Sequence, residues 1–118
     1  MQVRVAVIAL LVMSSGVHAE ERIEQMGLGL QSCGSFAKTF QADPDLTETM
    51  YFSWATGFMT GMNLAAAASN NKIRNLGATS MEEKQRVMRR FCDQHPLKAY
   101  KDGVLELYFA LPVSQPAH

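Results

Sequence analysis

The fold class is decided by the stretch from Asp45 to Ser69, which reads DLTETMYFSWATGFMTGMNLAAAAS. Its apolar residues recur every three or four positions, a spacing typical of one face of an α-helix rather than of a strand. At about 100° per residue, the predicted core face consists of Tyr51, Trp54, Ala55, Phe58, Met62, Ala65 and Ala66. The residues predicted on the opposite, polar face are Ser53, Thr56, Thr60 and Asn63. The stretch therefore predicts one long amphipathic helix.

A column of small side chains spaced by four runs between these two faces, formed by Ser53, Gly57, Gly61 and Ala65. Glycine inside a helix costs about 1 kcal/mol relative to alanine, so two glycines in register predict a compensating contact. We expect the backbone of another helix of the same bundle to pack closely along this column. One alternative is that a side chain of a partner protein enters it. A contact between membrane helices would use the same spacing, but the polar Thr56, Thr60 and Asn63 disfavour it.

Three shorter helices are predicted around this long one, so the four ranges are about 32–41, 45–69, 81–94 and 96–110. Asp43-Pro44 ends the first helix, Ser80 and Glu83 form a capping box for the third, and Pro96 is expected as the first residue of the fourth. The third helix is expected to turn inward Met81, Met88, Phe91 and Cys92. The fourth is expected to turn inward Leu97, Tyr100, Val104, Leu107, Tyr108 and Leu111.

These elements predict an all-α domain, similar to a small four-helix bundle, over residues 20–112. The lead-in 20–29 is expected to be loose with at most one helical turn, the loop 72–78 to be polar, and the tail 113–118 to be frayed. The aromatic residues predicted for the core are Phe36, Trp54, Phe58, Phe91, Tyr100 and Tyr108. The length of 118 residues allows one such domain.

The first nineteen residues have the pattern of a secretory signal peptide. A basic start with Arg4 is followed by an apolar run from Val5 to Met13 and by the small-x-small site that ends at Ala19. We expect cleavage after Ala19 and export to the periplasm. The alternatives are an uncleaved membrane anchor and a first helix of the mature protein, although the run is shorter than the roughly 20 residues that span a bilayer.

The two cysteines, Cys33 and Cys92, allow one disulfide. An exported chain would meet an oxidising compartment in which this bond persists, and closing so long a loop would stabilise the fold by about 4 kcal/mol. The alternative is a metal site, because Cys92 and His95 have a Cys-x-x-His spacing. Zinc would need two further ligands from Cys33, His118 or scattered carboxylates. We expect the disulfide, and no metal or cofactor.

The charge balance gives no sign of a polyanionic partner. There are 11 basic and 11 acidic residues, so neither nucleic acid nor stable membrane insertion after signal cleavage is expected. The cluster Arg86, Arg89 and Arg90 is either an anion-binding patch or, as such clusters commonly are, a solvated helix face. Asp93 and His95 either form a recognition site or cap and turn the chain. No nucleophile elbow, phosphate-binding loop or paired carboxylates are apparent, so we expect no enzyme activity.

Three stretches resemble motifs of known families. The run Trp54-Ala55-Thr56-Gly57-Phe58-Met59-Thr60-Gly61, and Phe91-Cys92 followed by Pro96, are similar to motifs of the Rap/Tai immunity proteins of type VI secretion. Cys33-Gly34-Ser35-Phe36 and the order of elements resemble the HdeA type of periplasmic acid-stress chaperone. Both resemblances imply a small, disulfide-linked, helical periplasmic protein. The first implies that it binds and blocks a toxic effector.

The function expected from these observations is binding of another protein, either an effector or a client. An immunity protein would recognise a secreted effector. An acid-stress chaperone would loosen when its carboxylates are protonated, because the chain would then repel itself. A third hypothesis is an envelope protein of unassigned role. A homodimer is compatible with each of the three.

Overall fold

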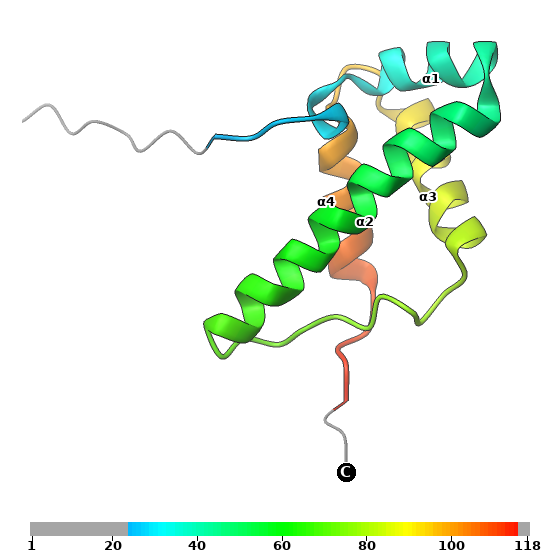
Figure 1. The fold of residues 1–118 in the computed structure, drawn as a ribbon. Helices are drawn as coiled ribbons and strands as arrows, with labels where there is room; N and C mark the ends of the chain where they lie inside the picture. Colours follow the sequence, from blue (N-terminus) through cyan, green and yellow to red (C-terminus); the bar gives the residue numbers. More distant parts are fainter. Residues whose placement is uncertain (1–23, 116–118) are drawn as a thin grey trace, which may run out of the picture.

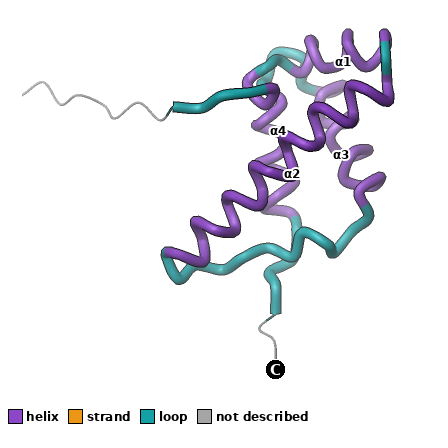
Figure 2. The backbone as a smooth tube through the Cα atoms, viewed as in Figure 1, coloured by secondary structure: helices purple, strands orange, loops and turns teal. Residues whose placement is uncertain are grey.

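The computed structural model describes residues 24–115, and the predicted signal peptide and His118 lie outside these residues. The described chain is helical, with two isolated backbone bridges in place of a sheet (Figures 1 and 2). Its elements are η1 (Leu28–Leu30), α1 (Cys33–Ala42), α2 (Pro44–Ala68), α3 (Met81–Gln94) and α4 (Tyr100–Ala110). The prediction of an all-α fold with four helices is confirmed.

The first two helices meet at a sharp corner that the sequence encodes locally. The Ser32 hydroxyl accepts the amide of Ser35 at 3.0 Å and caps α1. Asp43 ends α1, and its carboxylate accepts the amide of Leu46 at 3.1 Å, so it also caps α2. Pro44 is the first residue of α2, where its missing N–H costs nothing.

The predicted cap of α3 is half confirmed. The Ser80 hydroxyl accepts the Glu83 amide at 3.1 Å, which satisfies one of the free amides of the first turn. The Glu83 carboxylate pairs with Arg86 at 2.5 Å instead of bonding back to the Ser80 backbone.

The start of α4 was predicted wrongly. The helix begins at Tyr100, not at Pro96, because the segment between them serves α1. The carbonyl groups of Pro96 and Lys98 accept the amides of Gly34 and Cys33 at 2.9 and 2.8 Å. These are free amides of the first turn of α1, and an early start of α4 would leave them unsatisfied. Leu97 therefore lies on this connecting turn, 96% exposed, instead of in the core.

The core is built around the disulfide and a cluster of aromatic rings. Cys33 of α1 and Cys92 of α3 are bonded and fully buried, with their Cα atoms 4.6 Å apart. Beside them the rings of Phe36, Tyr51 and Tyr100 pack with centroids 5.0 to 5.2 Å apart. The disulfide pairing is confirmed, as is the burial of Phe36, Phe91, Tyr100 and Tyr108.

The buried face of α2 is rotated from the predicted one by about 40° at 100° per residue. Phe52 and Met59 are buried, whereas Trp54 and Phe58 are only partly buried and Ala65 is exposed. Trp54 is covered from outside by the segment before α1, since its Nε1 donates to the Met26 carbonyl at 3.0 Å. The lead-in that was predicted to be loose thus makes one turn, η1, against α2. Sequence periodicity carries no signal of this cover.

The C-terminal tail is ordered further than predicted. Arg74 and Val113 form an isolated bridge, and the Ser114 amide donates to the Ile73 carbonyl at 2.9 Å. Asn63, which was predicted to face solvent, is partly buried and holds the backbone of Arg74 through two bonds of 2.9 Å. The loop between α2 and α3 and the chain after α4 are therefore fastened to each other.

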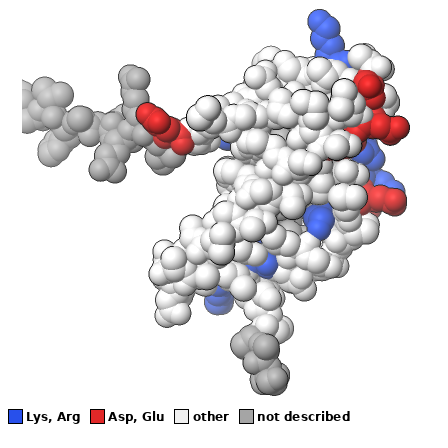
Figure 3. All heavy atoms as spheres, viewed as in Figure 1, with Lys and Arg blue, Asp and Glu red and all other residues white. Residues whose placement is uncertain are grey.

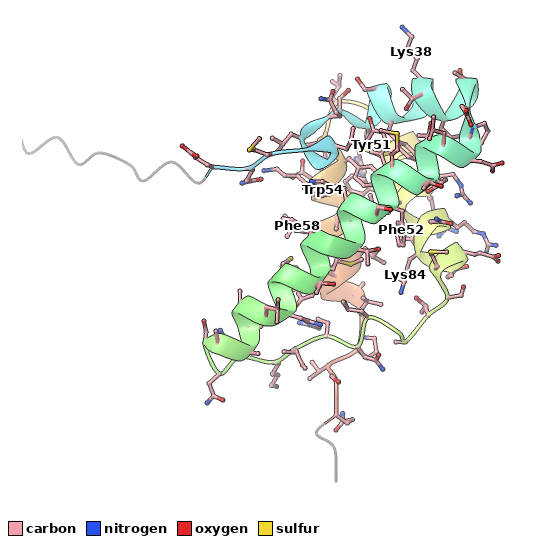
Figure 4. The ribbon with its side chains drawn as sticks, in the orientation of Figure 1. Lys38, Tyr51, Phe52, Trp54, Phe58 and Lys84 are labelled. Atoms are coloured by element: carbon pink, nitrogen blue, oxygen red, sulfur yellow. A yellow bond between two sulfur atoms is a disulfide. The ribbon has the colours of Figure 1, made fainter. Side chains whose placement is uncertain are left out.

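Met81 also lies outward, 60% exposed, because the first turn of α3 projects beyond the core. The neighbouring turn is held by Lys84, whose buried side chain donates to the Leu76 carbonyl (Figure 4).

Candidate interaction surface

The column Ser53, Gly57, Gly61 and Ala65 is exposed along its whole length. A Cβ atom added at Gly57 or Gly61 would meet nothing within 4 Å. The prediction that another helix of the bundle packs along it is therefore wrong. The close helix contact uses Gly103 of α4 instead, where an added Cβ would lie 2.5 Å from a ring carbon of Phe91.

The exposed side of α2 follows a heptad pattern. We call it the outer seam, and it consists of Leu46, Met50, Ser53, Gly57, Thr60, Leu64 and Ala67, all exposed. Alternating steps of four and three residues are the spacing at which one helix packs against another. Leu46 and Leu64 are 55% and 68% exposed, although both are large apolar residues. The seam thus has the pattern of a helix contact that no other part of the described chain makes.

The seam is also uncharged. The 23 residues from Thr49 to Asn71 include no Asp, Glu, Lys or Arg. Figure 3 shows the length of α2 as a largely white surface, with charged side chains toward its beginning, on α3, on the loop that follows α2 and on the segment before α1. Helices that face water normally carry charges on that side, and an uncharged apolar patch marks an interaction site.

Two hollows flank the seam. The corner hollow, about 320 Å³, lies between α1 and the start of α2 and is lined chiefly by Leu28, Ala42, Leu46 and Met50. The seam hollow, about 450 Å³, lies halfway along α2 and includes Met26, Ser53 and Gly57. Its wall is formed by Trp54 and Phe58, whose rings stack with centroids 5.0 Å apart (Figure 4).

The threonine hydroxyls on and beside the seam are satisfied within the helix. Thr60 Oγ1 donates to the Thr56 carbonyl at 2.8 Å, and Thr56 Oγ1 donates to the Phe52 carbonyl at 2.9 Å. Burying a polar group without a partner is costly, and burying one that already has a partner costs much less. The seam can therefore be covered by an apolar surface despite its threonines.

The arginine cluster splits between different roles. Arg86 pairs with Glu83, and Arg89 pairs with Glu48 of α2, each at 2.5 Å. Arg89 also lies over the Phe40 ring, 5.5 Å from its centroid. Two of the three arginines therefore have carboxylate partners from this chain, which weakens the hypothesis of an anion-binding patch.

A metal site at Cys92 and His95 would lack a thiolate ligand, because the sulfur of Cys92 is bonded to Cys33. The ring of His95 packs against Phe91 with centroids 4.7 Å apart. Within residues 24–115, no three His, Cys, Asp or Glu side chains are grouped so that they could hold a metal ion. In the same part of the chain, no helix combines the length and the hydropathy of a membrane span.

Two buried polar atoms have no hydrogen-bond partner within the described chain: the Tyr100 hydroxyl and Glu48 Oε2. Burial raises the pKa of Tyr100 well above its usual range, and the neighbouring charge of Glu48 raises it further. Glu48 Oε1 binds Arg89, and the side chain of Glu48 is 13% exposed.

No family model matches this chain, and neither a curated protein nor a solved structure does. The outer seam is therefore identified from the geometry of this chain alone. Sequence analysis identified four small residues of this region but assigned them to the interior of the bundle. The tract without charge from Thr49 to Asn71 was the available signal that this helix has an uncharged side outside the core.

Proposed function

We propose that this protein is exported and acts without catalysis, by binding another protein through the outer seam of α2. The observation that carries the proposal is the seam itself. It is a heptad face with no charge, and it exposes Leu46, Met50 and Leu64 although the chain has a core in which to bury such residues. Exposed apolar patches of this kind are typical of protein interfaces.

The corner hollow is the part of the seam best suited to a partner's side chain. Leu46 and Met50 are about half exposed at its rim, and methionine adapts its shape to different contacts. A buried apolar anchor in such a hollow supplies much of the affinity of a typical interface.

The class of partner that we propose is a secreted effector, which the protein would neutralise as an immunity protein does. The resemblance of Trp54–Gly61 and of Phe91-Cys92 to the Rap/Tai group supports this class. The buried disulfide is compatible with an exported protein. A periplasmic location after cleavage at Ala19 belongs to the same proposal.

The test is protection against a candidate effector encoded beside the gene. Cells that produce this effector in the periplasm are expected to survive with the wild-type protein and to die with Leu46→Arg/Met50→Arg. The control is Leu97→Arg, which places one arginine at an exposed apolar residue outside the seam. Equal protection by all three proteins, with unchanged thermal stability, would contradict the assignment of the corner hollow.

One observation favours a second candidate, an acid-stress chaperone. Glu48–Arg89 is the ion pair that joins two helices among the described residues, and strong acid generally weakens ion pairs of carboxylates. Such a chaperone would lose its near-ultraviolet circular dichroism at about pH 2.5 and then suppress aggregation of a client. Retained tertiary structure and unaffected aggregation at that pH would exclude this candidate.

A further inference from the structure

We propose that the free protein is a homodimer in which α2, from Ser53 to Ala68, packs antiparallel against the same segment of a second copy. The inference rests on the proposed function in one respect, since both assign the outer seam to binding. It divides the seam: the half after Ser53 is for self-association, and the corner hollow with Leu46 and Met50 stays open for the other partner.

The first argument is that the seam is complementary to itself. Leu64 protrudes with 68% of its surface exposed, and Gly57 lies in the seam hollow. They are seven residues apart, which is nearly two helical turns, so they point the same way about 10 Å apart. A two-fold axis between Thr60 and Gly61 places Leu64 of each copy opposite Gly57 of the other. One rotation therefore fills both hollows, as a symmetric interface requires.

The second argument is the space around the glycines. Nothing lies within 4 Å of a Cβ added at Gly57 or Gly61, so the fold of one chain does not require either glycine. Each nevertheless costs about 1 kcal/mol of helix stability relative to alanine. Close approach of a second α2 would compensate for this cost, because small residues let two helix backbones come near each other.

The third argument is the chemistry of the covered surface. Within the tract from Thr49 to Asn71, a copy of the seam brings no charge against another, since none occurs there. Glu24 is the one charged residue among those that line the seam hollow. The hydroxyls of Thr56 and Thr60 are already satisfied by their own helix. Apart from Glu24, this surface offers nothing to select a charged partner, so among apolar partners a second chain is the occupant that it fits best.

The register also limits what the dimer covers. With the axis between Thr60 and Gly61, Ser53 lies opposite Ala68 of the second copy, where α2 ends. Met50 and Leu46 then extend past the end of the partner helix. Each dimer thus presents two open corner hollows.

Sedimentation velocity of the disulfide-bonded mature chain over a concentration series tests the proposal. The weight-average mass is expected to rise from one chain to two. Leu64→Ala and Gly57→Gln are each expected to weaken the dimer at least tenfold, because burial of a leucine side chain contributes more than the 1.4 kcal/mol that a tenfold change represents. Gly57→Gln is expected to keep or raise monomer stability, since its side chain enters open space. Leu97→Ala is the matched control and is expected to dimerise normally.

A wild-type protein that remains monomeric throughout the series overturns the proposal. So does a dimer whose dissociation constant is unchanged in both Leu64→Ala and Gly57→Gln. The proposed function fails differently, because Leu46→Arg/Met50→Arg would then protect cells like the wild type, whatever the mass of the protein.

Discussion

Tyr100 and Tyr108 form a matched pair for testing the buried hydrogen bonds of this core. Both belong to α4 and both are buried. The Tyr108 hydroxyl donates to Asn63 Oδ1 at 2.8 Å, whereas the Tyr100 hydroxyl has no partner in the described chain. Replacing each by phenylalanine removes a single oxygen atom and keeps the ring packing.

The expected changes in the free energy of unfolding have opposite signs. A buried polar group without a partner costs about 1–3 kcal/mol, so Tyr100→Phe should stabilise the protein by about 1 kcal/mol. Tyr108→Phe should destabilise it by about 1 kcal/mol, the net value of one hydrogen bond. For a domain of this size, each corresponds to a shift of about 4–8 °C in Tm.

Tyr100 also makes the free energy of unfolding depend on pH. Burial keeps Tyr100 neutral in the folded state to a higher pH than in the unfolded chain, where its pKa is near 10. Ionisation of Tyr100 therefore leaves the free energy of unfolding unchanged below pH ~10 and lowers it as the pH rises above that value, by up to about 1.4 kcal/mol per pH unit. Tyr100→Phe should remove this part of the alkaline slope, and Tyr108→Phe should leave it in place.

Urea unfolding followed by tryptophan fluorescence, at neutral pH and at about pH 11, measures both effects. If Tyr100→Phe is as destabilising at neutral pH as Tyr108→Phe, the Tyr100 hydroxyl has a favourable partner and the reasoning is wrong. If the free energy of unfolding of Tyr100→Phe falls with alkaline pH as steeply as that of the wild type, ionisation of Tyr100 does not cause this fall.

Three further predictions concern packing and the loop. Cys33→Ala/Cys92→Ala should lower the free energy of unfolding by about 4 kcal/mol, because the bond closes a loop of 59 residues; an unchanged urea midpoint would contradict this. Gly103→Ala should lower the free energy of unfolding by about 1–3 kcal/mol, since its Cβ would overlap Phe91. Gly57→Ala should instead stabilise the monomer by about 0.5–1 kcal/mol. Equal effects in thermal melts would show that packing does not distinguish the two glycines. Asn63→Ala removes three hydrogen bonds to Arg74 and Tyr108 and should cost about 2 kcal/mol, with faster hydrogen exchange at Arg74 as the local check.

Local signals in the sequence were sufficient for most helix boundaries and for the disulfide. Ser32, Asp43 and Ser80 each cap the helix that follows, and each bond is made within three residues of the cap. The start of α4 could not be predicted in this way, because Pro96 and Lys98 use their carbonyl groups for α1, more than 60 residues earlier. A signal within one helix does not reveal a partner so distant in the chain.

The candidate site was predicted in part for the same reason. The spacing of Ser53, Gly57 and Gly61 indicated a helix contact, and periodicity alone could not say whether the contact lies within the chain. The segment before α1 determines this, because the Met26 carbonyl accepts a hydrogen bond from Trp54 and Gly29 of η1 lies against the Trp54 ring. With Trp54 covered from that side, the helix buries Phe52 and Met59, and the small residues point to solvent.

Under the proposed function, stability and binding are carried by different sides of α2. Its inner side packs Tyr51, Phe52 and Met59 into a core that the disulfide between α1 and α3 already holds together. Its outer side contacts nothing at Gly57 and Gly61, so substitutions there leave the contacts of the folded monomer unchanged. A binding surface separated from the core in this way can change its specificity without loss of folding, since surface substitutions typically alter stability by less than about 0.5 kcal/mol. Variants of Leu46 and Met50, which lie outside the proposed dimer contact, should therefore differ in what they bind while sharing one melting temperature.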